Sequence, residues 1–153
     1  MGRIAEGIHS LAITAWVGSL WVIGLMAAPT LFHYLPDRTL AGSIAARLFT
    51  YVALIGLACA GYLLLFRLVR FGGHSFRQAF FWVVLAMLLF TLAGQFGVQP
   101  ILATLKQQAL PHEVMESVFR DRFAPWHGVA SVIYLIECGL GAILVWLQPN
   151  APR

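Results

Sequence analysis

The sequence predicts an all-α fold, in which one integral membrane domain crosses the bilayer as a four-helix bundle. Of the 153 residues, 60% are hydrophobic and 10% are charged, whereas an average soluble domain is about half apolar and about a quarter charged. The mean hydropathy is +0.81. Four apolar runs each reach the length of about 20 residues that a membrane-spanning helix needs, so residues 1–153 form a single domain.

The first predicted span covers residues 8–32 and contains few polar residues. Pro29 lies close to its end and predicts a kink there, because proline removes a backbone hydrogen-bond donor. The turn that follows contains a second proline and then Asp37 and Thr39, either of which can cap the next helix. We therefore expect a short connection between the first two spans.

The second predicted span covers residues 45–70, and Arg67 and Arg70 close it. Gly56 and Ala60 lie four positions apart within this span. Small residues at this spacing allow membrane helices to approach closely. This face of the second span is therefore expected to pack against a neighbouring helix.

The third predicted span covers residues 79–105 and follows a tight, basic turn. Pro111 then begins a segment that predicts a short amphipathic helix at the membrane interface, before a last span over residues 127–147. The apolar side of this short helix contains Val114, Met115, Val118 and Phe119, and its charged side contains Glu113, Glu116, Arg120 and Asp121.

Four spans place both chain ends on one side of the membrane, which we expect to be the cytoplasmic side of a bacterial plasma (inner) membrane. Positive residues favour the cytoplasmic side. The ten Lys and Arg residues divide evenly, but the turn between the second and third spans holds its positive residues most compactly. The side of the chain ends holds Arg3, Arg67, Arg70, Arg77 and Arg153, and the other side holds Arg38, Arg47, Lys106, Arg120 and Arg122.

Glu137 is the most informative polar residue. It follows His127 by ten positions, about 15 Å of helix rise, and therefore lies close to the bilayer centre. A charge there costs about 2.5–3.5 kcal/mol, so such residues usually face a bundle interior and often mark a pathway for ions or protons. The alternative interpretation is a protonated Glu137 whose single interhelical hydrogen bond fixes the packing.

Polar residues form a stripe on each of the last two spans. On the fourth span the stripe consists of His127, Ser131, Tyr134 and Cys138, with Glu137 beside it. On the third span it consists of Thr91, Gln95 and Gln99. If the two stripes face each other, they form either an ion or proton pathway or a set of hydrogen bonds that only holds the bundle together. The pathway candidates are Glu137, Tyr134, Ser131, Gln95 and Thr91.

Sulfur-containing and histidine side chains are the candidates for holding a metal. Cys59, Met87 and Cys138 lie at similar depth if the spans are straight, and thiolate and thioether ligands suit Cu(I). The alternative is that these residues are ordinary apolar filler, because the sequence contains no CxxC or MxxM spacing.

Three histidines near the ends of spans could each ligate a haem or a metal, or carry a proton. His9 and His127 are expected on opposite sides of the membrane and therefore not to share one ligand, whereas His33 matches His127 in depth. The alternative for each is a structural, hydrogen-bonded role.

Residues in the first and last spans form a recognisable pattern. The first group consists of His9, Trp16, Gly18, Leu31-Phe32, Leu35-Pro36, Arg38, Gly42 and Leu48-Phe49. The second group consists of Phe123, Trp126-His127-Gly128 and Ser131. Together they resemble the transmembrane protein 205-like family, a group named for a domain of unknown function. The resemblance covers most of the chain, although the third span matches little beyond its hydrophobicity and Pro100.

That family is similar in outline to copper resistance protein D and to the HemJ-type membrane protoporphyrinogen oxidase. These are also small helical membrane proteins with a histidine near the start of a span. Because HemJ-like proteins use haem, the resemblance implies His9 as an axial ligand, without a second ligand at matching depth.

The sequence therefore predicts a membrane protein that binds or conducts a small ion or metal through a polar bundle interior. A role without catalysis is favoured over an enzymatic one. One alternative is a haem-binding, HemJ-like redox protein. Another is an accessory subunit that docks a larger membrane protein, or a homo-oligomer. Nucleic-acid binding is not expected, because the positive residues lie between apolar runs and form no basic stripe.

Overall fold

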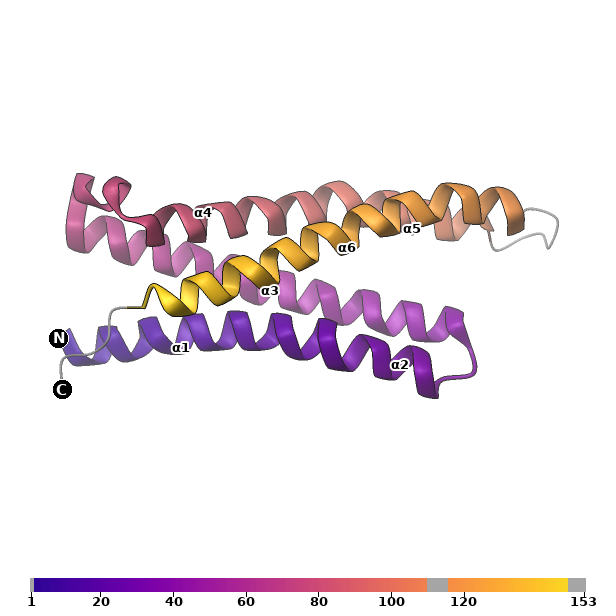
Figure 1. Ribbon diagram of the computed structural model, residues 1–153, viewed down its shortest axis with the longest axis horizontal. Helices are drawn as coiled ribbons and strands as arrows, with labels where there is room; N and C mark the ends of the chain where they lie inside the picture. The colour runs from indigo at the N-terminus through magenta and orange to yellow at the C-terminus, as the bar shows by residue number, and fades with distance from the viewer. Residues whose placement is uncertain (1, 110–115, 149–153) are drawn as a thin grey trace.

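The computed structural model describes residues 2–109 and 116–148. Four of its helical segments are long and apolar enough to cross a membrane, which confirms the predicted all-α, four-span architecture. The protein is therefore an integral membrane protein built as a helical bundle (Figure 1). These segments are Ile4–Tyr34, Arg38–Arg77, Ala79–Leu105 and Arg122–Trp146.

The first span consists of α1 (Gly2–Trp21), a π-helical turn η1 (Val22–Ala27) and α2 (Ala28–Tyr34). The second is a single helix, α3 (Arg38–Phe71), which begins earlier than the apolar pattern predicts. Its N-cap is Asp37, whose carboxylate accepts hydrogen bonds from the backbone N–H groups of the second and third residues of the helix, at 2.8 and 3.1 Å. Satisfying these free donors fixes the start of the helix.

The third span follows a 3₁₀ turn, η2 (Gly72–Arg77). It consists of α4 (Ala79–Leu92), a second π-helical turn η3 (Ala93–Val98) and α5 (Gln99–Ala109). Gly72 begins η2 with a φ of +52°, a conformation that favours glycine.

The last span is α6 (Glu116–Trp146), which continues without a break through Pro125. The amphipathic helix expected from Pro111 falls partly on residues 110–115, which lie outside the described residues, and it stays a prediction. From Glu116 onward the chain already belongs to α6.

Each π turn ends two residues before a proline. The turn η1 ends at Ala27 before Pro29, and η3 ends at Val98 before Pro100. A proline ring clashes with the carbonyl four residues earlier and cannot donate to it, and the wider π turn is one way for a helix to accommodate this. The first residues of η1 and η3 are 71 positions apart (93 − 22), as are the two prolines (100 − 29).

The four spans alternate in direction and contact one another as a closed ring. α3 packs against α1 and α4, and α6 packs against the same two helices. The start of α1, the turn η2 and the end of α6 lie at one end of the bundle, called here the η2 end (Figure 1). The turn between α2 and α3, with the end of α5 and the start of α6, lies at the other, called the α2 end.

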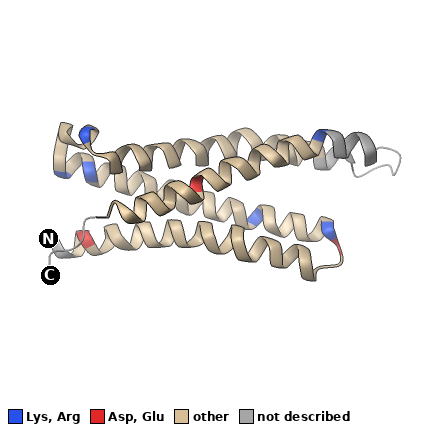
Figure 2. Ribbon diagram, viewed as in Figure 1, with Lys and Arg blue, Asp and Glu red and all other residues tan. Residues whose placement is uncertain are grey.

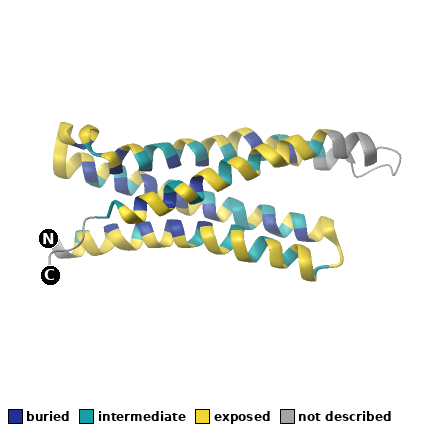
Figure 3. Cartoon of the chain, in the orientation of Figure 1, coloured by how far each residue is buried: buried dark blue, intermediate teal, exposed yellow. Residues whose placement is uncertain are grey.

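The bundle is apolar both inside and outside. Its core is built by residues with almost no exposed surface, which are Ile13, Trp16, Leu20, Leu63, Val84, Met87 and Leu144. Exposed residues cover the outward faces of every helix (Figure 3), and many of them are large and hydrophobic, such as Leu11, Leu65 and Leu135. A surface of this kind is a liability in water and is what lipid chains require.

Small residues bring α1 and α3 together. Gly56 is buried on α3, and a Cβ built on it would lie 2.5 Å from Nε1 of Trp16. Ala60, one turn further along α3, is fully buried. The indole of Trp16 therefore fills space that only a glycine at position 56 leaves free.

Candidate functional site

Glu137 lies on α6, nine residues before that helix ends at Trp146. Figure 2 shows an acidic position of α6 (red) well away from both ends of the bundle. It is 6% exposed, which makes it the one buried carboxyl group among the described residues. Its partner is Thr91 on α4, whose Oγ1 lies 2.5 Å from Oε1 of Glu137. The same Thr91 Oγ1 lies 2.9 Å from the carbonyl oxygen of Met87. The pair joins the third and fourth spans in the apolar interior.

Tyr134, one turn before Glu137 on α6, reaches the first span. Its hydroxyl donates a hydrogen bond to the carbonyl oxygen of Leu20, two residues before η1 begins. Its ring lies so close to Gly24 that a Cβ on that glycine would overlap it. The ring is also roughly perpendicular to that of Phe49, and the two centroids are 5.2 Å apart. Tyr134 thus packs beside the first π turn, and Glu137 bonds to the helix that leads into the second.

The remaining stripe residues are not assembled around Glu137. Ser131 is exposed, and its hydroxyl donates to the carbonyl of His127 in its own helix at 2.9 Å. His127 is exposed and stacks on Phe123. Gln95 is half-buried. The two predicted stripes therefore meet at Thr91 and Glu137, whereas His127 and Ser131 of the fourth-span stripe face outward.

The sulfur atoms lie in different settings. Cys59 and Cys138 are half-buried free cysteines, and Met87 is fully buried in the core. The backbone of Cys138 accepts a hydrogen bond from Nε1 of Trp21 at 3.3 Å. Among the described residues, no group of three or more His, Cys, Asp or Glu side chains is arranged to hold a metal ion.

The histidines lie at opposite ends of the bundle. His9 is near the η2 end on α1, whereas His33 on α2 and His127 early in α6 are exposed near the α2 end. The Nε2 atom of His9 is buried without a hydrogen-bond partner, as a haem or metal ligand would be. Its ring, however, packs against Phe66 and Phe80, with centroids 5.4 and 5.2 Å away. Aromatic rings thus occupy the space beside the imidazole, and His33 and His127 lie at the other end of the bundle, so the described residues do not fit a haem.

A buried cation beside His9 was not anticipated from the sequence, which treats Arg67 as the end of a span. Arg67 is 8% exposed. Its Nη1 donates to Oε1 of Gln78 at 2.7 Å, and its guanidinium carbon lies 4.0 Å from the centroid of Phe80. In the sequence, Arg67 lies four residues before the last residue of α3, Phe71, whereas Arg70 lies next to it. This difference in position is the signal that could have predicted burial for Arg67 and exposure for Arg70.

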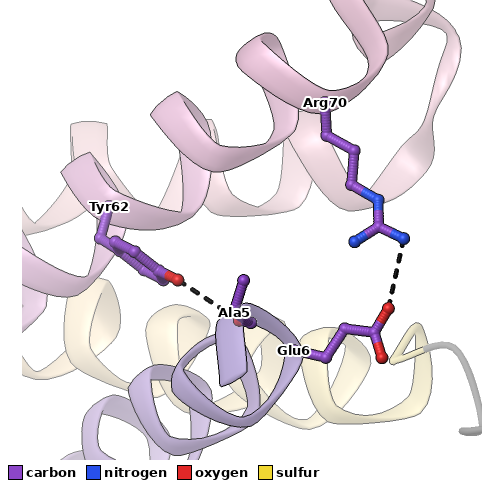
Figure 4. Close-up of polar contacts among 4 residues, drawn as sticks. All are labelled: Ala5, Glu6, Tyr62 and Arg70. Carbon is purple, nitrogen blue, oxygen red and sulfur yellow. Dashed lines mark hydrogen bonds and ion pairs between the residues drawn. The ribbon is translucent and has the colours of Figure 1, made fainter. Parts of the chain in front are cut away.

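Arg70 and Glu6 form the ion pair of this region. Nη2 of Arg70 lies 3.2 Å from Oε1 of Glu6, and both side chains are about half exposed. Eight residues earlier on α3, the hydroxyl of Tyr62 donates to the carbonyl of Ala5 at 3.4 Å (Figure 4). Two polar contacts therefore tie the start of α1 to the last turns of α3.

Comparison with known proteins gives one match. The family model described as "Domain of unknown function (DUF4149)" matches residues 11–111, from α1 through the third span. No curated protein and no solved structure matches the chain significantly. The resemblances to the transmembrane protein 205-like family, copper resistance protein D and HemJ remain predictions.

Proposed function

This chain belongs to the family defined by the domain of unknown function DUF4149, and we propose that it binds a small cation, in the first place a proton, at Glu137. The observation that carries the proposal is the contact between the carboxyl group of Glu137 and the hydroxyl of Thr91 inside the bundle. A carboxyl group at the centre of a membrane helix is costly when charged, at about 2.5–3.5 kcal/mol. A bound cation removes that cost.

Counting hydrogens favours the proton as the cation. A threonine hydroxyl has a single proton to donate, yet Thr91 Oγ1 lies within hydrogen-bond distance of both Met87 O and Glu137 Oε1. If Glu137 is protonated, it donates to Thr91, which donates to Met87, and every group is satisfied. If Glu137 is ionised, Thr91 can turn its proton toward the carboxylate. The threonine therefore serves both protonation states.

The proposal concerns binding, because the polar contacts do not continue through the membrane. Besides Thr91 and Glu137, the buried polar residues of the described chain are His9, Arg67 and Ser75, and all three belong to the first turns of α1, the last turns of α3 or η2. Ser131 and His127 are exposed on the other side of Glu137 along α6. Conduction along the predicted stripe needs a rearrangement of α6, whereas binding does not.

The experiment is infrared difference spectroscopy on purified protein in lipid, titrated with acid and base. Wild-type protein is expected to show a protonated carboxyl band that appears and disappears with pH, and Glu137→Gln removes it. Thr91→Val shifts the band, because the hydrogen bond is lost, whereas Ser131→Ala leaves it in place. Identical pH-difference spectra for wild type and Glu137→Gln would sink the proposal.

A metal ion as the cation is distinguished by a second titration. At fixed pH, addition of a monovalent or divalent metal salt leaves the carboxyl band unchanged if the site takes a proton alone. Loss of the band with added metal, in wild type but not in Thr91→Val, would assign the site to the metal.

We further propose that the η2 end faces the cytoplasm of a bacterial cell. Within the described chain, the positive residues Arg67 and Arg70 lie near the end of α3 and Arg77 lies in η2, all at this end of the bundle. Positive residues near span ends favour the cytoplasmic side. A cysteine introduced at Gly73 is expected to react with a membrane-impermeant thiol reagent only after the cells are opened. Labelling of intact cells would reverse the orientation.

A further inference from the structure

The two buried side-chain nitrogens that lack a hydrogen-bond partner in the described chain lie in one place. They are Nε2 of His9 and Nε of Arg67. Both side chains pack on the ring of Phe80, at 5.2 Å for the His9 ring and 4.0 Å for the Arg67 guanidinium. Each residue is more than nine-tenths buried. A buried group without its hydrogen bond is uncommon and calls for a partner.

The positive charge of Arg67 has no acidic partner among the described residues. The nearby carboxylate, Glu6, is bonded to Arg70 at 3.2 Å. The neutral amide of Gln78 accepts one hydrogen bond from Arg67 but brings no charge. A buried charge without a counter-charge is strongly unfavourable. The site is therefore short of both an acceptor and a negative charge.

Exposed basic side chains lie next to the buried Arg67, toward the surface of the η2 end. Arg67 and Arg70 flank the same ring, with guanidinium carbons 5.5 and 5.8 Å from the centroid of Phe71. Beyond it, η2 exposes His74 and Arg77. Among the side chains that the structure describes at this end, the arginines are Arg67, Arg70 and Arg77 and the carboxylate is Glu6.

Aromatic side chains place this end at the level of lipid headgroups. Phe76 is 53% exposed and Trp82 is 55% exposed. The indole N–H of Trp82 donates to the carbonyl of Phe76 at 2.8 Å, so the ring is held across the end of η2. Tryptophan is enriched at membrane interfaces, where one part of the ring is in lipid and the other is near water. Phosphate groups of the lipid lie at this depth.

We propose that the η2 end binds the phosphate of an anionic phospholipid headgroup, with Arg67 as its inner contact and Arg70 and Arg77 as its outer contacts. The phosphate supplies the acceptor and the negative charge that Arg67 lacks, and arginine suits phosphate because its fork of N–H groups matches two oxygens. The acyl chains of the same lipid lie against the exposed apolar faces of α3 and α4.

The test is native mass spectrometry of the detergent-purified full chain, titrated with phosphatidylglycerol or with phosphatidylcholine of the same acyl chains. Wild-type protein is expected to retain phosphatidylglycerol preferentially. Arg77→Gln and Arg67→Gln are each expected to weaken that retention on the order of fivefold, since a basic residue near an anionic membrane surface contributes about that factor. Arg77 lies in an exposed turn, so its variant tests the proposal even if Arg67→Gln fails to fold.

Arg38→Gln is the matched control, because Arg38 is an exposed arginine at the α2 end. It is expected to retain phosphatidylglycerol as wild type does. Equal retention of the two lipids by wild-type protein, or an equal loss in Arg38→Gln and Arg77→Gln, overturns the proposal. Displacement of the lipid by millimolar inorganic phosphate also overturns it, since the ligand would then be free phosphate.

Discussion

Trp16 on α1 occupies the space above Gly56 on α3, with its indole nitrogen 2.5 Å from where a Cβ would stand. The indole is 1% exposed and sits in the core, so it cannot swing away into lipid. The contact between the first two spans therefore depends on the absence of one methyl group.

Gly56→Ala is expected to destabilise the bundle by about 1–3 kcal/mol, as other overpacked cores are. The measurement is the free energy of unfolding in mixed detergent–SDS micelles. Gly61→Ala is the control on the same helix, since a Cβ there meets nothing within 4 Å, and it is expected to stabilise by about 0.5–1 kcal/mol. Equal effects of the two substitutions would contradict the packing described.

Gly24→Ala is expected to displace Tyr134, because a Cβ at position 24 overlaps the tyrosine ring. Gly97→Ala makes a matched control in the second π turn, where a Cβ meets nothing within 4 Å. The loss in unfolding free energy for Gly24→Ala should be smaller when Tyr134→Leu is already present, since contacting residues are not additive. Additive losses would mean that the two residues do not meet.

Tyr134→Phe removes the hydrogen bond to the carbonyl of Leu20 while keeping the ring. Interhelical hydrogen bonds in membranes average about 0.6 kcal/mol and reach about 1.7 kcal/mol, so a loss within this range is expected in the same unfolding measurement. Tyr51→Phe is the control, because Tyr51 is 60% exposed on α3. A larger loss for Tyr51→Phe than for Tyr134→Phe would be inconsistent with the structure.

Asp37→Ala is expected to cost about 1 kcal/mol, since it removes both cap hydrogen bonds at the start of α3. Asp37→Asn retains an acceptor oxygen and should recover most of the stability. Thermal unfolding followed by circular dichroism compares the three proteins. If Asn behaves like Ala, the carboxylate acts by its charge and not as a cap.

The fold class could be predicted from sequence because a membrane-spanning helix needs about 20 consecutive, mostly apolar residues, and four such runs are visible in the sequence. The cap at Asp37 was one of two predicted candidates, and the structure selects it because its side chain reaches the backbone of Leu40. The π turns were not predicted, although Pro29 and Pro100 mark both of them. A proline predicts a distortion, but which kind forms depends on how the neighbouring helices pack.

The candidate site was less predictable. Helical spacing placed Thr91 and Glu137 on candidate faces, and the structure brings them into contact. The same spacing also selected Ser131 and His127, which face outward. The spacing of polar residues along one helix does not show which residues of the neighbouring helix will face them, because a π turn in that neighbour changes which of its residues point inward. The packing of His9 on α1 and Arg67 on α3 against the same ring, Phe80, could not be predicted from the sequence, because no local pattern links residues so far apart in the chain.

The 71-position offset between the two π turns divides the four spans into two halves with the same order of elements. Each half is a bent helix followed by an unbroken one, and since each half returns to the side where it started, the second enters the membrane in the same orientation as the first. Parallel repeats of this kind are related by an axis along the membrane normal. The ring of contacts agrees, because the bent spans alternate with the unbroken ones. Leu20 and Thr91 are also 71 positions apart, and they meet residues that lie one turn apart on α6: the carbonyl of Leu20 accepts from Tyr134, and the hydroxyl of Thr91 contacts Glu137.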